Sequence, residues 1–565
     1  MKRWITIFLS IVMLFAIGGC AVENEKQAET SSVTSHGEAV LSTAESALES
    51  SADSMIEESS RDTSSRPSEE TSQEESLPPD TPPAEETGAR IWLDAELFSE
   101  DGTIAVRYAD TDTKDWIGIY PYGVEPGTTP SITWQYAVGE GSLFFKASAL
   151  QGAGDYWVFL CDNDGYVVLD MASITVSDGD TKDYGAKALS VSVTKENGFS
   201  HTEVTVTPSC SEEVTYSLYW SKDGKRLETY MPIHTFTHQG SAPFTVTLND
   251  CLYMPAEADG MEIAVKKGNS ASCFAPVSDV LKVQESRLLY SFAVLTDLHI
   301  TSSKPAHLSH LALAFEDIKN NETPVSAIFT TGDNTDRGAV EEYELLMQII
   351  EDAGEIPPIY FAMGNHDMAY GDGYEAQVER FKNYTGLENP YYSIEMEGAR
   401  FIVLTSQQAT TSGAMNGDQV RWLKAELAKC DPDTPVFLFL HQPLKDTVSG
   451  TLSYVDPDIQ DWFGVQNADK ELRKMLKEYP NAVLFTGHTH WMLESLRPLL
   501  CGKGEDASFV NCASVGYLWT DENKAAGGSQ GMYVEVYEDY ILLRGREFLF
   551  GKWCASAQFM IPIVK

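Results

Sequence analysis

The chain has 565 residues, and its 84 acidic residues against 40 basic ones give a formal net charge of −44. A chain of this length exceeds one ordinary hydrophobic core, so about three domains are expected. Stable nucleic-acid binding is not expected, because phosphate backbones are bound by surfaces rich in lysine and arginine. A small phosphate ester is not excluded, since bound metal cations can reverse the local potential.

The first residues have the composition of an export signal. Lys2 and Arg3 precede an apolar stretch over residues 5–17, which is shorter than a membrane span requires. The next residues, Ile17-Gly18-Gly19-Cys20, resemble a bacterial lipobox. That resemblance implies a signal peptide over residues 1–19, a lipid on Cys20, and an extracytoplasmic protein anchored to the bacterial cell membrane. An ordinary secretory signal followed by an incidental cysteine is the alternative.

Residues 20–88 predict a disordered, acidic linker. From residue 21 to residue 87 the chain is rich in Ser, Thr, Glu and Pro and holds 17 acidic residues against three basic ones. Such a segment cannot bury enough apolar surface to offset its chain entropy. As a flexible coil it would span on the order of 45 Å and hold folded domains away from a membrane.

Two β-sandwich domains are expected next, over residues 89–180 and 186–285. Short runs of alternating apolar and polar residues, broken by Gly and Pro, predict their strands. These runs cover residues 103–108, 116–120, 142–146 and 156–160 in the first domain, and 202–207, 215–220, 244–248 and 261–266 in the second. Residues 115–120 resemble a strand of immunoglobulin-like (Ig-like) accessory domains of bacterial surface proteins. Both domains are candidates for binding a cell-wall polymer.

Eight cysteines follow Cys20, and none stands in a CxxC motif, so a zinc ribbon is not expected. An exported protein can form disulfides. Cys501 with Cys512 is one candidate pair, and buried free thiols are the alternative.

From residue 288 to the C-terminus, apolar strands alternate with helical segments, which is typical of an α/β layered fold. Helices are predicted over residues 307–319, 340–350 and 419–429. Buried strands are predicted over residues 292–296, 327–331, 359–362, 436–440 and 483–486. Further strands, expected to finish a second sheet, are predicted over residues 532–536, 541–546 and 558–564.

A polar cluster follows each of the five buried strands. In chain order the clusters are Asp297-Leu298-His299, Gly332-Asp333-Asn334, Gly364-Asn365-His366-Asp367, His441, and Gly487-His488-Thr489-His490. Because the carboxyl ends of parallel strands converge on one crevice, these side chains are expected to meet. Asp297 and His299 would point to the same side of an extended chain, and Asp333 could bridge two ions. Nitrogen and oxygen ligands without a thiolate suit Mn²⁺, Zn²⁺ or iron.

Together these motifs closely resemble the calcineurin-like metallophosphoesterases. The resemblance covers residues 288–565 and implies a four-layer α/β/β/α fold around a dinuclear metal site. It implies that one metal is held by Asp297, His299, Asp333 and His490. It implies that the other is held by Asp333, Asn365, His441 and His488.

The same resemblance implies the hydrolysis of a phosphate ester by a hydroxide that bridges the two metals. His366 is the expected general acid, since a histidine suits proton transfer near neutral pH. Asp367 is expected to orient the His366 ring. Arg337 is a weaker candidate for a phosphate contact, and a solvated or structural role is its alternative.

Details of the motifs narrow the class of enzyme. Asp336 stands where purple acid phosphatases have the tyrosine of a GDxxY motif, which argues against that branch. The motifs around Asn365, His441 and His488 resemble those of class III phosphodiesterases, so diesters are favoured over monoesters. The alternative from another class is a surface adhesion or scaffold lipoprotein with a vestigial phosphoesterase domain.

Several residues near the clusters are less decisive. Trp491, Tyr517 and Trp519 follow site motifs and could line the substrate cleft or belong to the core. His307 and His310 are expected on an exposed helix face, where they would be structural or solvated.

Overall fold

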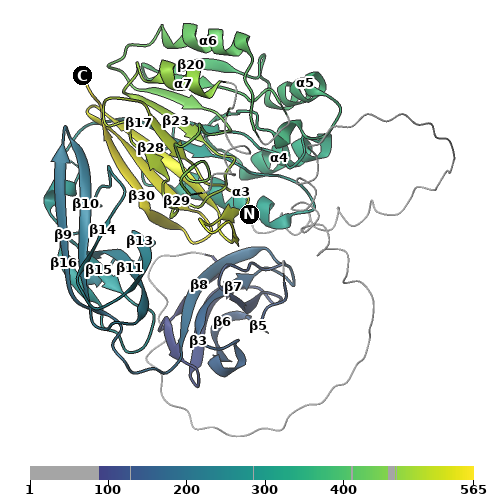
Figure 1. Cartoon of the computed structure of the whole chain (residues 1–565). Coiled ribbons are helices and arrows are strands. Elements are labelled where there is room, and N and C mark those ends of the chain that lie inside the picture. The colour runs from purple at the N-terminus through teal and green to yellow at the C-terminus, as the bar shows by residue number, and fades with distance from the viewer. Residues whose placement is uncertain (1–87, 128, 284, 409–411, 456–464, 466–467) are drawn as a thin grey trace, which may run out of the picture. The chain divides into compact units, whose positions relative to one another are not determined.

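The structure is a computed structural model that describes residues 88–127, 129–283, 285–408, 412–455, 465 and 468–565 (Figure 1). The predicted signal peptide, Cys20 and nearly all of the acidic linker lie outside the described residues. Among the residues that are described, no helix is long and apolar enough to cross a membrane. The described chain is mostly sheet, with few helices.

The first β-rich segment contains two sheets. One has the order β1 (Arg90–Leu93), β3 (Thr103–Thr111), β6 (Gly139–Lys146). The other has the order β2 (Leu97–Ser99), β8 (Val168–Ser177), β7 (Gly154–Cys161), β4 (Trp116–Pro121), β5 (Thr133–Tyr136), and a short 3-10 helix spans Ala147–Ala149. Strand alternation directs Ile104, Ile117 and Val158 into one buried cluster shared by both sheets.

The second β-rich segment also contains two sheets. One has the order β14 (Phe244–Thr247), β10 (Phe199–Pro208), β9 (Ala186–Glu196). The other has the order β12 (Lys225–Arg226), β11 (Glu213–Lys222), β15 (Gly260–Ala264), β16 (Cys273–Pro276), with β13 (His234–Gln239) also paired to β11 and a 3-10 helix over Asp279–Leu281. Val204, Leu218 and Ile263 share their core. The bounds of both predicted sandwich domains stay predictions.

The remaining chain forms two six-stranded sheets. The first has the order β19 (Ile359–Tyr360), β18 (Ile328–Thr330), β17 (Leu288–Leu295), β28 (Gln530–Tyr537), β29 (Tyr540–Glu547), β30 (Lys552–Pro562). The second has the order β20 (Tyr392–Met396), β21 (Ala399–Val403), β22 (Val436–Phe439), β23 (Ala482–Thr486), β25 (Ser508–Asn511), β24 (Leu499–Leu500). A small hairpin joins β26 (Leu518–Trp519) to β27 (Ala525–Ala526).

The three C-terminal strands were expected to finish a second sheet, and this expectation is wrong. β28 pairs antiparallel with β17, with Phe292 opposite Val534, so β28, β29 and β30 extend the first sheet. β18 occupies only one edge of β17, and the other edge would leave backbone groups unpaired in the interior. Pairing with β28 satisfies them.

An apolar cluster joins the two six-stranded sheets. It includes Phe292 and Phe329 of the first sheet together with Phe401, Phe437 and Phe439 of the second. The ring centroids of Phe292 and Phe401 lie 5.3 Å apart, and those of Phe329 and Phe439 lie 4.3 Å apart. Aromatic pairs at these separations add to the burial energy.

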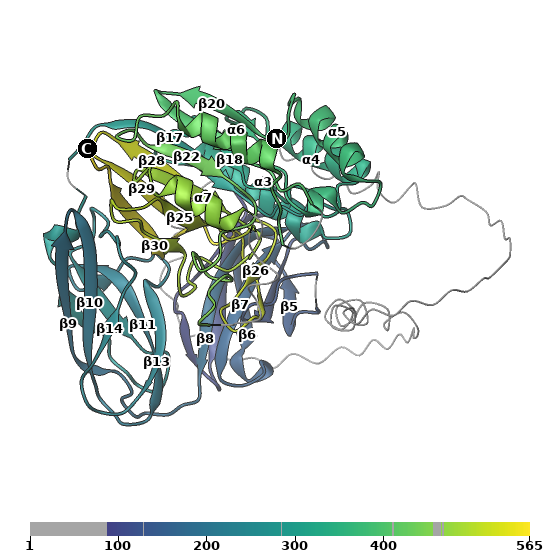
Figure 2. The ribbon, with the colours of Figure 1, turned by 45° about the horizontal axis from the view of Figure 1, so that its top comes forward.

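Two further clusters place the helices against the sheets (Figure 2). α3 (Pro305–Asn320), α4 (Val340–Ala353) and α5 (Tyr374–Thr385) contribute to a cluster with β17 and β18. α6 (Gly417–Leu427) and α7 (Asp469–Leu476) contribute to one with β21, β22 and β23. The α6 helix begins two residues before the predicted start, because the Asn416 side chain accepts a hydrogen bond from the Gln419 nitrogen and caps it.

Candidate metal centre

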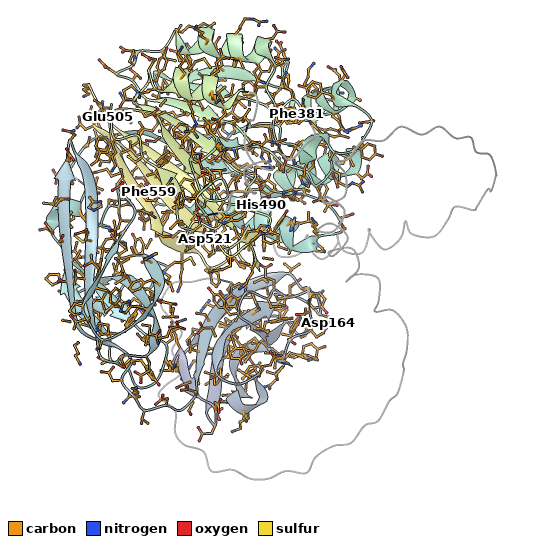
Figure 3. All side chains as sticks on the ribbon, viewed as in Figure 1. Asp164, Phe381, His490, Glu505, Asp521 and Phe559 are labelled. Atoms are coloured by element: carbon orange, nitrogen blue, oxygen red, sulfur yellow. The ribbon has the colours of Figure 1, made fainter. Side chains whose placement is uncertain are left out.

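The polar clusters come from both six-stranded sheets. Asp297 and His299 follow β17, Asp333 follows β18, and Asn365 and His366 come after β19. From the second sheet, His441 follows β22, while His488 and His490 follow β23; His490 is labelled in Figure 3. Each of the seven predicted metal ligands is buried, and the most exposed, His488, is 7% exposed.

One group of side chains contains Asp297, His299, Asp333 and His490. Each offers a potential ligand atom, and these atoms all lie within 4.8 Å of one another. His490 Nε2 is 2.9 Å from Asp297 Oδ1, and His299 Nε2 is 3.7 Å from Asp333 Oδ2. The structure therefore brings together the four residues predicted for one metal.

A second group contains Asp333, His441 and His488, also within 4.8 Å. His441 Nε2 is 3.0 Å from Asp333 Oδ2 and 3.1 Å from His488 Nδ1. Asp333 thus belongs to both groups, as expected for a bridging carboxylate. Asn365, predicted as the fourth ligand of this group, is buried, and its Oδ1 accepts a hydrogen bond of 3.1 Å from Gln442 Nε2.

The donor atoms fit a pair of metal ions. Asp297 Oδ1 has three imidazole nitrogens within 4.0 Å, from His490, His299 and His441. The Nε2 atoms of His299 and His490 face each other at 3.3 Å. Ring nitrogens and carboxylate oxygens converging in a buried space, without a thiolate, are the donor set that Mn²⁺, Zn²⁺ or iron accepts.

A polar partner on the second ring nitrogen orients two of these histidines. His490 Nδ1 donates to the Tyr517 carbonyl oxygen at 3.3 Å, and His299 Nδ1 lies 3.4 Å from Asp336 Oδ1. A partner on Nδ1 fixes the ring and leaves Nε2 for a metal. Their Nε2 atoms are therefore directed into the cluster.

The charges in the cluster follow from burial and from close partners. Burial alone would lower the pKa of His299, but Asp297, Asp336 and Asp333 raise it to about 9. Burial and the neighbouring His441 lower the pKa of His488 to about 3. Burial would raise the pKa of Asp333, yet the surrounding histidines hold it below its ordinary value. The Asp333 carboxylate is thus ionised and His488 is neutral, which are the forms that bind metals, whereas His299 would release its proton when a metal binds.

Most of the predicted ligands have an unusual backbone conformation. The φ angles of Asp297, His299, Asp333, His488 and His490 are 51°, 46°, 52°, 68° and 58°. Left-handed residues other than glycine are uncommon and concentrate at functional sites. The expectation that Asp297 and His299 lie on an extended chain is therefore wrong, because the chain turns at both residues.

Two motif glycines allow the loops to approach each other. A Cβ atom at Gly487 would lie 2.2 Å from Asp297 Oδ2, and one at Gly364 would lie 2.1 Å from Asp333 Oδ1. Both distances are far below van der Waals contact. The carboxylates of one strand end therefore pack directly against the backbone of another.

His366 lies beside this cluster, and its ring centroid is 4.5 Å from that of His299. Its Nδ1 donates to the Asp336 carbonyl oxygen at 2.7 Å, and its main-chain nitrogen donates to Asp333 Oδ1 at 2.8 Å. Nε2 is therefore the ring nitrogen left for proton transfer.

Asp367 does not orient the His366 ring as expected. Its fully buried carboxylate accepts hydrogen bonds from the main-chain nitrogens of Gly364 and Thr335 and from the Asn334 side chain. In the 3-10 turn over His366–Met368, the side chains of His366 and Asp367 point in different directions. The His366 ring therefore contacts the Asp336 carbonyl oxygen and not the Asp367 carboxylate. Asp367 holds two motif loops together.

His307 and His310 are buried, so the expected exposed face of their helix is wrong. His307 Nδ1 donates to the His299 carbonyl oxygen at 3.0 Å, and His310 Nδ1 donates to the Gly516 carbonyl oxygen at 3.0 Å. α3 packs with this face against the loops of the site. Their helical spacing correctly predicted that His307 and His310 lie on one face of the helix. Because both side chains are polar, the sequence did not indicate that this face is buried.

Two further residues lie near the cluster: Gln442, which was not assigned a role from sequence, and Tyr517, which was a candidate for lining the cleft. Gln442, next to His441, contacts Asn365 as described above. The Tyr517 ring lies 4.2 Å from the His490 ring and 5.3 Å from the His299 ring. Tyr517 therefore borders the site, whereas Trp491 is 5% exposed and belongs to the core.

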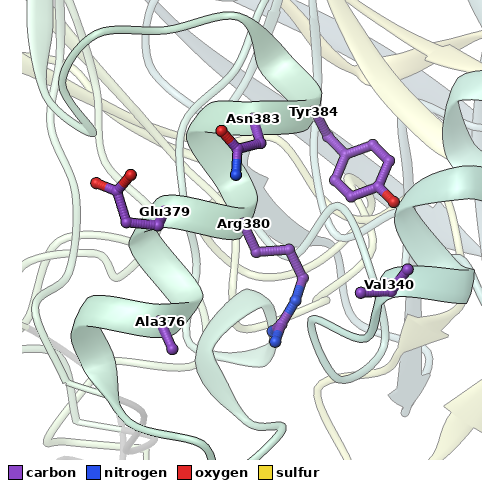
Figure 4. A pocket seen from close by; sticks show the side chains of 6 residues that line it. All are labelled: Val340, Ala376, Glu379, Arg380, Asn383 and Tyr384. Carbon is purple, nitrogen blue, oxygen red and sulfur yellow. The ribbon is translucent and has the colours of Figure 1, made fainter.

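Arg337 lies on the turn after Asp336, where its main-chain nitrogen donates to Glu342 Oε2 at 2.8 Å. A cavity of about 400 Å³ lies nearby between α4 and α5 (Figure 4). It is lined by Val340, Ala376, Glu379, Arg380, Asn383 and Tyr384. None of these is a predicted ligand, so this cavity is separate from the metal centre.

The fold and the site together define a two-sheet α/β domain with a buried cluster of aspartates and histidines able to hold metal ions. Residues 290–492 match the family model described as calcineurin-like phosphoesterase. This segment is thus similar to the calcineurin-like phosphoesterases, and members of that family use two divalent metals.

Two curated proteins are similar to part of the chain. A probable glycerophosphodiester phosphodiesterase GpdQ of Arcobacter nitrofigilis is 30% identical over 178 residues, which cover 31% of this chain and 59% of that protein. A probable cyclic nucleotide phosphodiesterase of Fibrobacter succinogenes is 30% identical over 115 residues, covering 20% of this chain and 40% of that protein. The chain therefore spans about half the length of these relatives.

A solved structure of vacuolar protein sorting 29 from Cryptosporidium parvum aligns with 49% of this chain and 98% of its own. Its sequence identity is 14% and its TM-score is 0.24.

Proposed function

We propose that this protein is a metal-dependent phosphoesterase that hydrolyses phosphodiesters outside the cytoplasm. The observation that carries the proposal is the gathering of ligand atoms from two sheets into two groups that share Asp333. The family match over residues 290–492 and the two relatives named as phosphodiesterases support the same reaction class.

Residues of the chain would have two roles in this reaction, metal binding and proton donation. Asp297, His299, Asp333 and His490 would hold one ion, and Asp333, Asn365, His441 and His488 the other. Bound there, two ions would supply Lewis acidity toward the phosphoryl oxygens and lower the pKa of a water molecule. His366, fixed through Nδ1 by the Asp336 carbonyl oxygen, would donate a proton from Nε2 to the leaving oxygen.

Diesters are proposed ahead of monoesters. The names of the two relatives and the motifs around Asn365, His441 and His488 favour this choice. The core clusters on both faces of the paired sheets support the finer inference of an α/β/β/α arrangement for residues 288–565.

A comparison of a chromogenic diester with the matching monoester tests the reaction. We expect bis(4-nitrophenyl) phosphate to be hydrolysed faster than 4-nitrophenyl phosphate by protein loaded with Mn²⁺, Zn²⁺ or iron. Asp333→Asn should reduce turnover at least about 10²-fold, because it removes the shared charge. Equal turnover by wild type and Asp333→Asn under every metal would contradict the proposal and favour the adhesion or scaffold alternative.

The location is a separate part of the proposal. It rests on the export signal and on Cys20, which lie outside the described residues. Cells fed a radioactive fatty acid should label the wild-type protein and not Cys20→Ala. Equal labelling of both would remove the lipid anchor.

A binding role for the first β-rich segment is also proposed. Trp134, Tyr136 and Tyr166 are 51%, 47% and 59% exposed, and Trp134 and Tyr166 each contact the buried Trp116 ring edge-on. Exposed rings held by a buried one suit stacking on a cell-wall glycan. Trp134→Ala should reduce retention on insoluble cell-wall polymer without changing phosphodiester turnover; unchanged retention would remove this role.

A further inference from the structure

Two cysteines that are 250 residues apart in sequence meet between the second β-rich segment and the α/β segment. The Sγ atom of Cys251 lies 2.6 Å from that of Cys501. Cys251 follows β14 and is fully buried, whereas Cys501 follows β24 and is partly exposed. The predicted alternative partner, Cys512, is buried elsewhere, with its main-chain nitrogen donating to the Thr486 carbonyl oxygen.

The surroundings of this pair hold both chain segments in place. The Cys251 main-chain nitrogen donates to the Ser200 carbonyl oxygen at 3.0 Å, and its carbonyl oxygen accepts from the Met560 nitrogen at 2.9 Å. Beside it, Lys503 Nζ lies 2.7 Å from Asp250 Oδ2. Leu252 also forms an isolated bridge with Phe559 of β30. The contact is thus fixed on both sides by backbone pairing and by an ion pair.

We propose that Cys251 and Cys501 form a disulfide that covalently joins the second β-rich segment to the α/β segment. Disulfides form and persist in the oxidising compartments to which an export signal directs a protein. The bond would close a long loop, and such a bond restricts the unfolded chain.

The two thiols have different parts in bond formation. The hydrogen bond from Cys251 lowers the pKa of Cys501, and Cys501 is also the more accessible sulfur. Its thiolate attacks one sulfur of a small disulfide oxidant such as oxidised glutathione and releases one thiolate. The Cys251 sulfur, after losing its proton to solvent, then attacks Cys501 Sγ and releases the second. One oxidant disulfide is reduced to two thiols for each protein disulfide formed.

The bond lies away from the metal centre. β25 runs parallel to β23, and Asn511 pairs with Thr486 at the end that leads to His488. β24 runs antiparallel to β25, with Leu500 opposite Phe509, so Cys501 leaves the sheet at its opposite end. We therefore expect the disulfide to affect stability and not the turnover of the phosphodiester.

Peptide mapping of the full chain tests the bond. After equilibration with oxidised glutathione, free thiols are alkylated and the protein is digested with trypsin without reduction. Residues 227–266 hold Cys251 alone and residues 478–503 hold Cys501 alone, so we expect these two peptides to be joined. Reduction before alkylation should add two adducts to the intact chain. Separate alkylated peptides, or a bond from residues 478–503 to residues 504–524, would overturn the proposal.

Thermal unfolding gives a second readout. Reductant should lower the thermal midpoint of the wild-type protein to the value that Cys251→Ala shows without reductant. The midpoint of Cys251→Ala itself should not change when reductant is added. Cys430→Ser is the matched control, because Cys430 is also partly exposed, and it should keep the wild-type response. A wild-type midpoint that does not respond to reductant, together with unlinked peptides, would exclude the disulfide even if Cys251→Ala folds poorly.

Discussion

Gln442 acts on the centre through one amide hydrogen bond. Its Nε2 donates to Asn365 Oδ1, the proposed neutral ligand of the second ion, and the Gln442 side chain is fully buried. Groups that hold a metal ligand in place commonly change metal affinity or activity by about 10–100-fold when they are removed. Gln442 is therefore a positioning residue.

We predict that Gln442→Leu weakens metal binding by about 10–100-fold. Metal-free protein would be titrated with Mn²⁺ while turnover is followed, and saturating metal should restore most of the activity. Gln348→Leu, at a half-buried position on α4 whose side chain donates to Asp352, is the control and should titrate like wild type. Identical metal affinity for both variants would contradict the role.

Glu547 is a buried acid that takes no part in the proposed mechanism. Burial raises its pKa to about 8 from an ordinary value of 4.5, although the main-chain nitrogens of Ser529 and Leu549 donate to its Oε1. The folded protein therefore keeps this carboxyl protonated where the unfolded chain has lost the proton. The free energy of unfolding that protonated Glu547 contributes is fully present below about pH 4.5 and is lost as the pH rises toward 8.

Glu547→Gln should consequently stabilise the protein at alkaline pH. Glutamine does not titrate, so its advantage should grow from pH 5 to pH 9 and reach on the order of 3 kcal/mol. Thermal midpoints of both proteins across this pH range would measure it. A difference that does not change with pH would show that Glu547 is already ionised in the fold.

At the scale of elements, the strands of the α/β segment were the most predictable part of the chain. Continuous apolar runs predicted β17, β22 and β23 to within a few residues, because strands buried on both faces have no polar positions. The strand that pairs with β28 could not be predicted from sequence, because apolar composition does not specify which neighbouring strand a β-strand will pair with. Left-handed turns at the ligands were also missed, because aspartate and histidine adopt that conformation only where the surrounding structure requires it.

The aromatic cluster between the two sheets should be the main source of their stability. Phe439 is fully buried there and contacts Phe329 and Phe485. Phe439→Ala should cost about 3–5 kcal/mol, because it removes buried area and leaves a cavity. Denaturant unfolding would measure this against Phe144→Ala, whose ring is 50% exposed. Equal midpoints for the two variants would contradict this packing.

At the scale of the whole molecule, the proposed metal centre lies between the two six-stranded sheets and takes ligands from both. Its proposed ligands leave β17 and β18 on one side and β22 and β23 on the other. A ligand that binds only the folded state stabilises it by about 4 kcal/mol at a thousandfold excess over its dissociation constant. Bound ions should therefore raise the stability of the protein as well as its activity.

We predict that a chelator lowers the thermal midpoint of the metal-loaded protein by several degrees. Adding back Mn²⁺ or Zn²⁺ should restore both the midpoint and turnover. Asp333→Asn, which lacks the shared carboxylate, should show a much smaller response to either treatment. A midpoint that is insensitive to chelator would contradict metal binding at this position.

The family resemblance and the seven proposed ligands could be recognised in the sequence because each motif places metal-binding residue types directly after a predicted strand. The roles of Asp367 and of the face of α3 that carries His307 and His310 could not, since each depends on a loop contacted from elsewhere in the fold. The meeting of Cys251 with Cys501 likewise depends on how separate segments pack, and spacing along the chain gives no sign of it.

The left-handed backbone of five proposed ligands has a practical consequence for mutagenesis. Alanine disfavours positive φ by roughly 1–2 kcal/mol, so alanine scanning here would combine a lost ligand with a strained turn. Asparagine tolerates that region of φ and ψ better than other residues that carry a side chain. Exchanging Asp297 or Asp333 for asparagine should thus isolate coordination chemistry, and comparing it with alanine would report how much conformational tension each loop stores.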